Sequence, residues 1–133
     1  MTSNAFSGVG TVFKRNSVAV AEVNSISGPN ITRGTIDVTS LDSTGGYREF
    51  IGGFRDGGEV TLNMNFTLDS YDDFKVDIEA STLKTYSIEL PDTNTTTFSF
   101  SALVTSLGMA VPMDDKVTSD VTLKISGQVT LAS

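Results

Sequence analysis

Two long runs in which apolar and polar residues alternate constrain the fold of this chain more than any other feature. In the first run the apolar residues are Val60, Leu62, Met64, Phe66 and Leu68. In the second they are Val117, Val121, Leu123, Ile125, Val129 and Leu131. A period of two residues is typical of a strand with one buried face and one polar face. The runs therefore predict two long strands, and Gly127 predicts a bulge or bend in the second.

Shorter runs predict further strands around these two. Alternation over residues 86–90 stops at Pro91-Asp92 and resumes over residues 98–104, which is a hairpin pattern. Upstream, residues 18–26 and 31–41 are strand candidates, joined by a turn that contains Gly28 and Pro29.

One segment, from Ser70 to Ser81, has a helical pattern instead. Ser70 followed by Asp73 resembles a capping box. One face of this helix would carry Tyr71, Phe74 and Ile78. Such a stripe packs on a sheet, so the sequence predicts a mainly β fold: an antiparallel β-sandwich or partial barrel with one flanking helix.

The segment from Asp37 to Gly58 combines three glycine pairs with apolar residues such as Tyr47 and Phe50 and indicates a long glycine-rich arm. Ordering about 20 residues costs roughly 1 to 2 kcal/mol each in backbone entropy, more than its few apolar side chains return on burial. We therefore expect the arm either to stay mobile or to become ordered by lying across another surface. The alternative, that the glycine pairs are ordinary turns within one domain, stays open at this stage.

Composition excludes several classes of function. With no cysteine and no histidine, the chain has no disulfide framework or thiolate metal site, and no residue spacing nominates a catalytic group. We therefore expect no enzyme activity, no cofactor and no metal. The net charge of −7 disfavours tight binding of nucleic acid. No apolar run approaches the roughly 20 residues of a membrane span.

Several blocks of sequence together resemble a known family. They are IDVTSLDSTGGYREFIGG at 36–53, RDGGEV at 55–60, IELPD at 88–92, FSFSALVTSLG at 98–108 and VPMDDKVTSDVTLKISGQV at 111–129. With a short helix near Tyr71, their order and spacing resemble the tail tube (major tail) proteins of long-tailed, non-contractile bacteriophages. The resemblance implies the tail-tube fold. It also implies hexameric rings that stack into a hollow conduit for genome delivery into the host. In these rings the arm would project as a long hairpin and pack on neighbouring subunits and on the next ring.

Two sets of site residues follow as expectations from this resemblance. The arm contacts between subunits and rings would be Leu41, Tyr47, Arg48, Glu49, Phe50, Ile51, Phe54, Arg55 and Asp56. The candidate lumen residues, on the polar parity of the two long strands, are Glu59, Thr61, Asn63, Asn65, Thr67, Asp120, Thr122, Lys124 and Gln128. Acidic and small polar side chains would let DNA slide, and Asp120 or Glu59 would offset Lys124. The sequence does not decide which strand face lines the lumen.

Partners and location are likewise implied by the resemblance. They are further copies of the chain, a tape-measure protein, tail terminator and tail tip or initiator proteins, and double-stranded DNA in transient, non-specific passage. The expected location is the virion tail, after assembly in the host bacterial cytoplasm. We expect a single tail tube domain over residues 1–133, without a C-terminal immunoglobulin-like domain. The alternatives are a particle-decorating or carbohydrate-binding β-sandwich module, or the tube subunit of a gene transfer agent or contractile injection device.

Overall fold

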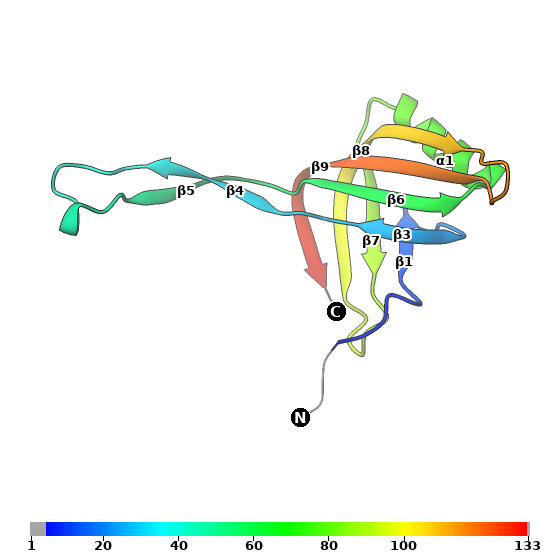
Figure 1. Ribbon diagram of the computed structural model, residues 1–133, viewed down its shortest axis with the longest axis horizontal. Helices are drawn as coiled ribbons and strands as arrows, with labels where there is room; N and C mark the ends of the chain where they lie inside the picture. Colours follow the sequence, from blue (N-terminus) through cyan, green and yellow to red (C-terminus); the bar gives the residue numbers. More distant parts are fainter. Residues whose placement is uncertain (1–4, 133) are drawn as a thin grey trace.

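The computed structural model describes residues 5–132 (Figure 1), so the expectations for residues 1–4 and 133 lie outside the described residues. The strands are β1 Val12–Arg15, β2 Val18–Ala19, β3 Val23–Ser27, β4 Thr32–Asp37, β5 Phe50–Asp56, β6 Glu59–Asn65, β7 Lys84–Glu89, β8 Thr97–Ala110 and β9 Thr118–Ala132. The helix α1 is Leu68–Glu79, and a short 3-10 helix, η1, is Thr44–Gly46. The mainly β fold with one flanking helix is confirmed.

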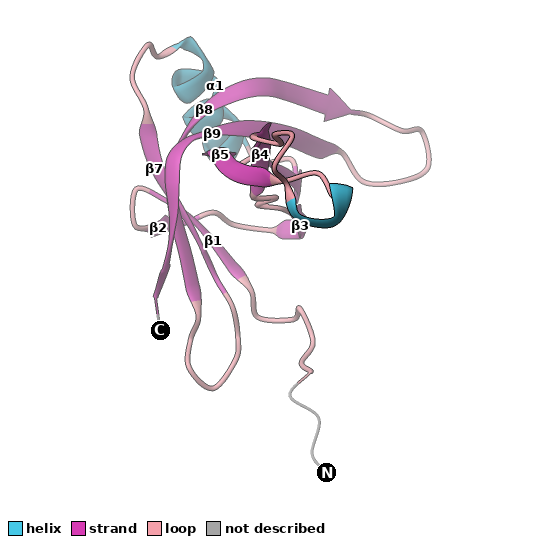
Figure 2. Cartoon of the chain, turned by 90° about the vertical axis from the view of Figure 1, so that its left-hand side faces the viewer, coloured by secondary structure: helices cyan, strands magenta, loops and turns pink. Residues whose placement is uncertain are grey.

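Seven of the strands form one antiparallel sheet in the order β2-β1-β7-β8-β9-β6-β3. The sheet curves into a half-barrel, and Figure 2 shows its strands running in two different directions around the bend. The long strands β8 and β9 cross this bend, with register shifts between Ser99 and Ser101 and between Val104 and Ser106. Gly127 has φ of +90° and lies between Ser126 and Thr130, where the register with β8 shifts, so the predicted bulge or bend is confirmed.

The core lies on the inner face of this half-barrel and follows the predicted alternation. Its buried apolar residues are Phe13, Val60, Leu62, Met64, Phe74, Tyr86, Ile88, Phe100, Ala102, Val104, Val121, Leu123 and Ile125. The first long run ends earlier than expected, because β6 stops at Asn65 and Leu68 already begins the helix. Phe66 and Leu68 are therefore exposed and outside the core.

The predicted strand over residues 18–26 is wrong as a single element. It is divided into β2 and β3 by a turn in which Glu22 has φ of +57°. β2 pairs with β1, whereas β3 pairs with β6 at the other edge of the sheet. The predicted hairpin over residues 86–104 is confirmed as β7 and β8.

The helix begins at Leu68 and ends at Glu79, so the predicted start at Ser70 and end at Ser81 are wrong. Its N-cap is Thr67, whose side-chain oxygen accepts a hydrogen bond from the backbone N–H of Ser70 at 3.3 Å. The buried face contains Ser70, Phe74 and Asp77, at the i, i+4, i+7 spacing of one helical stripe. Ile78, expected on this face, is 37% exposed.

A buried carboxylate fastens the helix to the sheet. Asp77 is 2% exposed and accepts hydrogen bonds from Arg15 Nε at 2.6 Å, Arg15 Nη2 at 2.7 Å and the Tyr86 hydroxyl at 2.7 Å. Burial raises the pKa of Asp77, but the hydrogen bonds from Arg15 and Tyr86 outweigh it, and the net effect lowers that pKa. A lowered pKa gives stability that is present above the unfolded value of about 3.9 and is lost as pH falls through the folded value.

Removing one partner of the Arg15–Asp77 pair should destabilise the folded protein. We expect Arg15→Met to lower the free energy of unfolding by about 3 to 5 kcal/mol at pH 7, because it leaves the Asp77 carboxylate buried without its cation. Urea denaturation measures this directly. The matched control is Lys75→Met, which breaks the exposed Lys75–Glu79 pair and should cost about 0.5 kcal/mol or less. Equal losses in the two variants would contradict the role given to Asp77.

Candidate functional site

The arm is the hairpin of β4 and β5, and it extends well beyond the body of the molecule (Figure 1). The projecting hairpin is confirmed, although it begins earlier than the expected Asp37, because β4 already pairs with β5 from Thr32. In the register, Ile36 stands opposite Ile51 and Asp37 opposite Phe50. The two strands form a sheet of their own, separate from the half-barrel.

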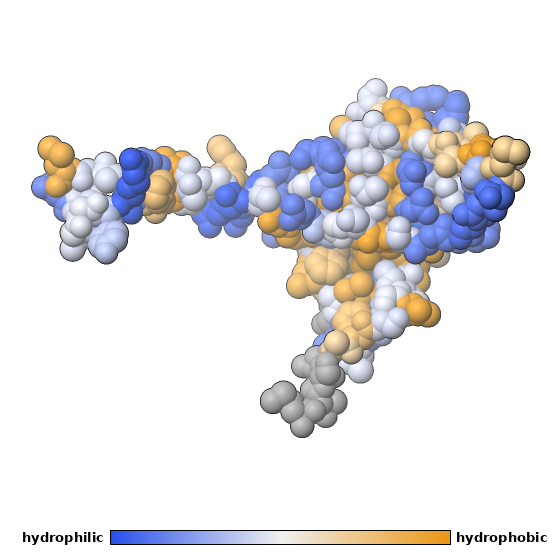
Figure 3. Space-filling model, viewed as in Figure 1, coloured by the Kyte–Doolittle hydropathy of each residue, from blue (hydrophilic) through white to orange (hydrophobic). Residues whose placement is uncertain are grey.

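Apolar side chains of the arm are left in solvent. Phe54 is 99% exposed, Leu41 is fully exposed and Tyr47 is 78% exposed. Phe50 and Ile51 are each about half exposed. Figure 3 shows these apolar groups interleaved with polar ones along the projecting hairpin. A two-stranded ribbon has no second layer on which to bury them, so this surface is available for another molecule.

The tip of the arm is nevertheless fixed by local polar contacts. Arg48 Nη1 lies 3.1 Å from Asp37 Oδ2, and the N–H of Glu49 donates to Thr39 Oγ1 at 2.7 Å. The hydroxyl of Thr39 is the main cause that lowers the pKa of Asp37, followed by its backbone N–H and, among weaker effects, Arg48. Among the expected contact residues, Arg48 and Glu49 therefore also hold the tip of their own chain together.

The base of the arm is tied to β9. Asp56 accepts hydrogen bonds from Gly58 N at 2.8 Å and from Lys124 Nζ at 3.0 Å. These bonds, the one from Gly58 first, lower the pKa of Asp56. Lys124 is thus offset by Asp56 and not, as expected, by Asp120 or Glu59, because its long side chain reaches past β6 to the arm.

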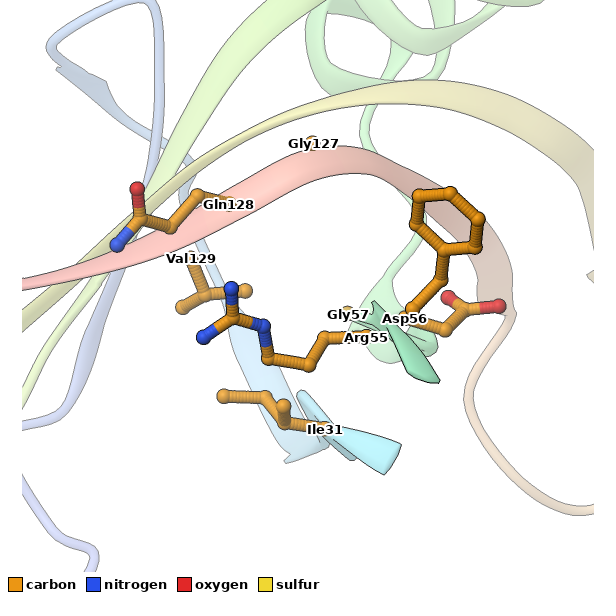
Figure 4. Close-up of a pocket in the computed structure, with 8 residues that line it drawn as sticks. Ile31, Arg55, Asp56, Gly57, Gly127, Gln128 and Val129 are labelled. Atoms are coloured by element: carbon orange, nitrogen blue, oxygen red, sulfur yellow. The ribbon is translucent and has the colours of Figure 1, made fainter. Parts of the chain in front are cut away.

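Two glycines permit this close approach of arm and body. A Cβ on Gly57 would lie 2.6 Å from Ile125 Cγ2, and Gly58 has φ of +77°, where a Cβ would overlap the carbonyl oxygen of Asn30. Beside them is a hollow of about 460 Å³. Figure 4 shows its lining, which comes from Ile31, Phe54, Arg55, Asp56, Gly57, Gly127, Gln128 and Val129. The arm therefore leaves the body in a set direction.

The structure brings most of the predicted lumen residues onto one sheet face. β6 and β9 are neighbours, with Glu59 opposite Lys124, Thr61 opposite Thr122 and Asn63 opposite Asp120. These residues and Asn65 share the face that points away from the core. Gln128 lies past the bend at Gly127, in the hollow beside the arm, and Thr67 caps the helix.

A chain of hydrogen bonds covers part of this polar face. The amide of Asn24 donates to Asn63 Oδ1 and to Asn65 Oδ1, each at 3.0 Å. Asn63 in turn donates to Asp120 Oδ1 at 2.6 Å, and Lys116 Nζ donates to Asn24 Oδ1 at 3.2 Å. These donors are occupied within the chain, which leaves fewer of them for a passing phosphate.

The comparison with known families decides what kind of protein this is. A family model described as "Lambda phage tail tube protein, TTP" matches residues 4–132. The chain is a member of this tail tube protein family. No curated protein sequence matches it. The family is structural and not enzymatic, as the absence of any catalytic spacing predicted.

Several solved structures share the fold of this chain. The tail tube protein is similar to a chain in the virion of a native gene transfer agent particle, at 19% identity and a TM-score of 0.81 over 97% of this chain and 100% of that chain. It is also similar to a chain in the tail of an empty gene transfer agent particle with C6 symmetry, at 18% identity and a TM-score of 0.79 over 97% and 100%. A chain of the sheath–tube complex of the PVC extracellular contractile injection system matches at 20% identity and a TM-score of 0.72 over 92% and 88%.

Three residues of the tail tube protein make long-range contacts that no local sequence pattern indicated. Asn24 organises the polar face but belongs to a short edge strand. Asp56 looked like an outward contact, yet it binds Lys124, 68 residues away. Arg33 stands opposite Arg55 across the arm, a pairing that depends on the hairpin register. Local patterns do not reveal such long-range partners.

Within residues 5–132, no group of three or more acidic side chains is placed to hold a metal ion. Over the same residues, α1 is too short and too polar to cross a membrane.

The glycine at the arm base generates a direct test. We expect Gly58→Ala in the tail tube protein to lower the free energy of unfolding by about 1 to 3 kcal/mol, because alanine is strained at positive φ and its Cβ meets the Asn30 carbonyl. Gly34→Ala is the matched control, since it lies on the same arm with nothing within 4 Å of its Cβ. Thermal denaturation compares the two variants. A Gly34→Ala variant as unstable as Gly58→Ala would refute the strained base.

Proposed function

We propose that this tail tube protein is the repeating subunit of a tube of stacked hexameric rings that conducts double-stranded DNA from a phage particle into a host bacterium. The observation that carries the proposal is the arm, whose apolar side chains project beyond the body and find no cover within their own chain. A closed ring or stack of identical subunits supplies that cover. The C6 symmetry of the gene transfer agent tail with the same fold supports six-fold rings.

The arm supplies the apolar contacts in this proposal. Leu41, Tyr47, Phe50, Ile51 and Phe54 pack on neighbouring subunits and on the next ring. Burial of each returns roughly 1.5 to 3 kcal/mol, the scale at which a few aromatic anchors dominate an interface. The polar residues of the arm fix the register between the arm and the neighbouring subunits; they are Arg48, Glu49, Arg55 and Asp56.

The sheet edges supply a second contact. β2 and β3 are the edge strands of the seven-stranded sheet, and unpaired edges invite pairing with another chain. In a ring, the layer formed by β3, β6, β9 and β8 continues into the same layer of the next subunit. The rings then line a conduit with β-sheet, and the β3 edge is covered, while the β2 edge lies outside this layer.

The polar face of β6 and β9 is the lumen wall in this proposal. It combines the carboxylates of Glu59 and Asp120 with the neutral side chains of Thr61, Asn63 and Thr122. Its one lysine, Lys124, is already paired with Asp56. A wall with few free donors and net negative charge holds DNA phosphates weakly, which is what rapid passage requires.

The proposal extends to the partners and the place of assembly. The tube assembles in the host cytoplasm around a tape-measure protein, starts on tip or initiator proteins and is closed by a terminator. The chain acts as a single domain in a non-contractile, long-tailed phage. The similarity to gene transfer agent and contractile injection structures favours a second candidate function, as the tube subunit of such a particle. A sheath protein, or a packaged cargo other than a phage genome, would identify this second function.

Electron microscopy of the purified protein tests the proposal. Negatively stained samples should contain rings or tubes of uniform diameter. A chain that stays monomeric at high concentration and in the presence of tail initiator proteins would instead support a decorating or carbohydrate-binding module.

The arm anchors generate a prediction about assembly. Phe54→Ala should shorten or abolish tubes while leaving the melting temperature of the free subunit within about 2 °C, because Phe54 is 99% exposed and makes no core contact. Val76→Ala removes an exposed apolar side chain from the helix and serves as the control. Tube length by microscopy and melting by circular dichroism separate the two effects. Tubes of normal length and stability in Phe54→Ala would exclude the anchor role.

The lumen generates a second prediction, for DNA passage. Asp120→Lys should slow DNA ejection more than Thr61→Lys does, because the first changes the wall by two charges per subunit and the second by one. Raised salt should relieve both defects. Ejection kinetics of phage particles carrying the variants, beside an Asp72→Lys control on the helix, measure the effect. Ejection at the normal rate in both wall variants means that this face is not the lumen.

A further inference from the structure

Two arginines face each other across the arm base without a counter-charge. Arg33 and Arg55 are directly opposed in the register of β4 and β5. Like charges in this position destabilise a hairpin. The other two arginines, Arg15 and Arg48, each bind a carboxylate. Among residues 5–132, no carboxylate pairs with Arg33 or Arg55, and the only hydrogen bond of the Arg33 side chain goes to the carbonyl of Gly53 at 3.3 Å.

One of these arginines, Arg55, lines the hollow at the arm base. Figure 4 shows the Arg55 side chain extending between Ile31 and Val129, which form apolar walls. The side chain of Arg33 lies over Gly52, where a Cβ would overlap its guanidinium. The arm base thus offers a hollow with apolar walls at Ile31 and Val129 beside the positive charges of the arm, while Asp56, which also lines it, is already paired with Lys124. This combination suits an apolar side chain followed by acidic ones.

The loop between β8 and β9, residues 111–117, has the complementary character. Met113 is fully exposed and Val111 is 66% exposed. Asp114 and Asp115 follow directly, and within residues 5–132 neither forms an ion pair; Asp115 accepts only from the N–H of Lys116 at 2.7 Å. Lys116 Nζ is turned toward Asn24, so it does not neutralise the two aspartates.

The register of β6 and β9 places this loop and the arm base at opposite ends of the molecule. The arm joins β6 at Glu59, opposite Lys124, whereas the loop joins β9 at Thr118, opposite Asn65. These ends are separated by about 20 Å of strand. In Figure 1 the loop is at the end of the body away from the arm. The two surfaces therefore do not meet within one chain, but a second copy displaced along the strands brings them together.

We propose that the loop of one copy docks on the arm base of the next copy in the stack. Asp114 and Asp115 pair with Arg33 and Arg55, and Met113 enters the hollow beside the Arg55 side chain, which itself lies between Ile31 and Val129. The contact is head-to-tail, the class of interface that builds open filaments. This inference rests on the proposed function, because it assumes that subunits stack, and it names the surfaces through which they do so.

Charge reversal tests the pairing. Arg55→Glu and Asp114→Arg should each raise the protein concentration needed for tube growth by about tenfold, and the double variant should recover most of that loss. Turbidity and microscopy over a concentration series give the threshold. Thresholds at the wild-type value in both single variants, or a double variant no better than either one, would overturn the proposal.

Controls separate this contact from folding and from assembly in general. Both residues are exposed, so urea denaturation of the free variants should match wild type. Lys75→Glu, a reversal on the helix, should leave the threshold unchanged. A wild-type protein that forms no rings or tubes overturns the proposed function and this inference with it. A wild-type protein that assembles while the charge variants behave normally overturns this inference alone.

Cross-linking provides a measurement that does not depend on the charges. The chain contains no cysteine, so Ile31→Cys with Met113→Cys in one chain introduces the only two thiols. Mild oxidation of its assembled tubes should give a ladder of disulfide-linked oligomers on a non-reducing gel, because each subunit links to the next. Monomers alone, from tubes of normal appearance, would contradict the docking.

Discussion

A two-stranded hairpin has no second layer in which to bury its apolar side chains, and this constraint governs the molecule. The half-barrel has a buried core of its own, in which Phe13, Phe74 and Tyr86 pack together. The arm does the opposite and places Leu41 and Phe54 in solvent. One chain therefore contains a domain with a packed core and an arm with exposed apolar side chains, which we propose are covered by neighbouring copies.

Contacts at the base of the arm fix its orientation relative to the body. Gly57 and Gly58 allow the backbone to pass close to β9, and the Asp56–Lys124 pair holds it there. Because β6 and β9 are antiparallel, the arm leaves from one end of the sheet and the loop at 111–117 from the other. In the proposed stack these unlike ends meet head to tail, and repetition of that contact gives a tube.

The parts that the sequence predicted well are those with local periodicity. The alternation around Leu62 and Leu123 located the core strands and, with them, the polar face. The partners that decide the finer structure are distant in sequence and leave no periodic trace: Asp77 takes a core position on the helix because Arg15 and Tyr86 reach it. The N-cap of the helix is likewise Thr67 and not the predicted Ser70. The pairing of Arg33 opposite Arg55 follows from the hairpin register, which the sequence did not predict.

Amide hydrogen exchange of residues 38–49, in free subunits and in assembled tubes, tests the central claim most directly. An isolated two-stranded hairpin is marginally stable, so these amides should exchange quickly in the free subunit, while those of β6 and β9 stay protected. Assembly should slow exchange in the arm strongly. Equal exchange of the arm in both states would contradict the account, because the arm would then gain no cover from its neighbours.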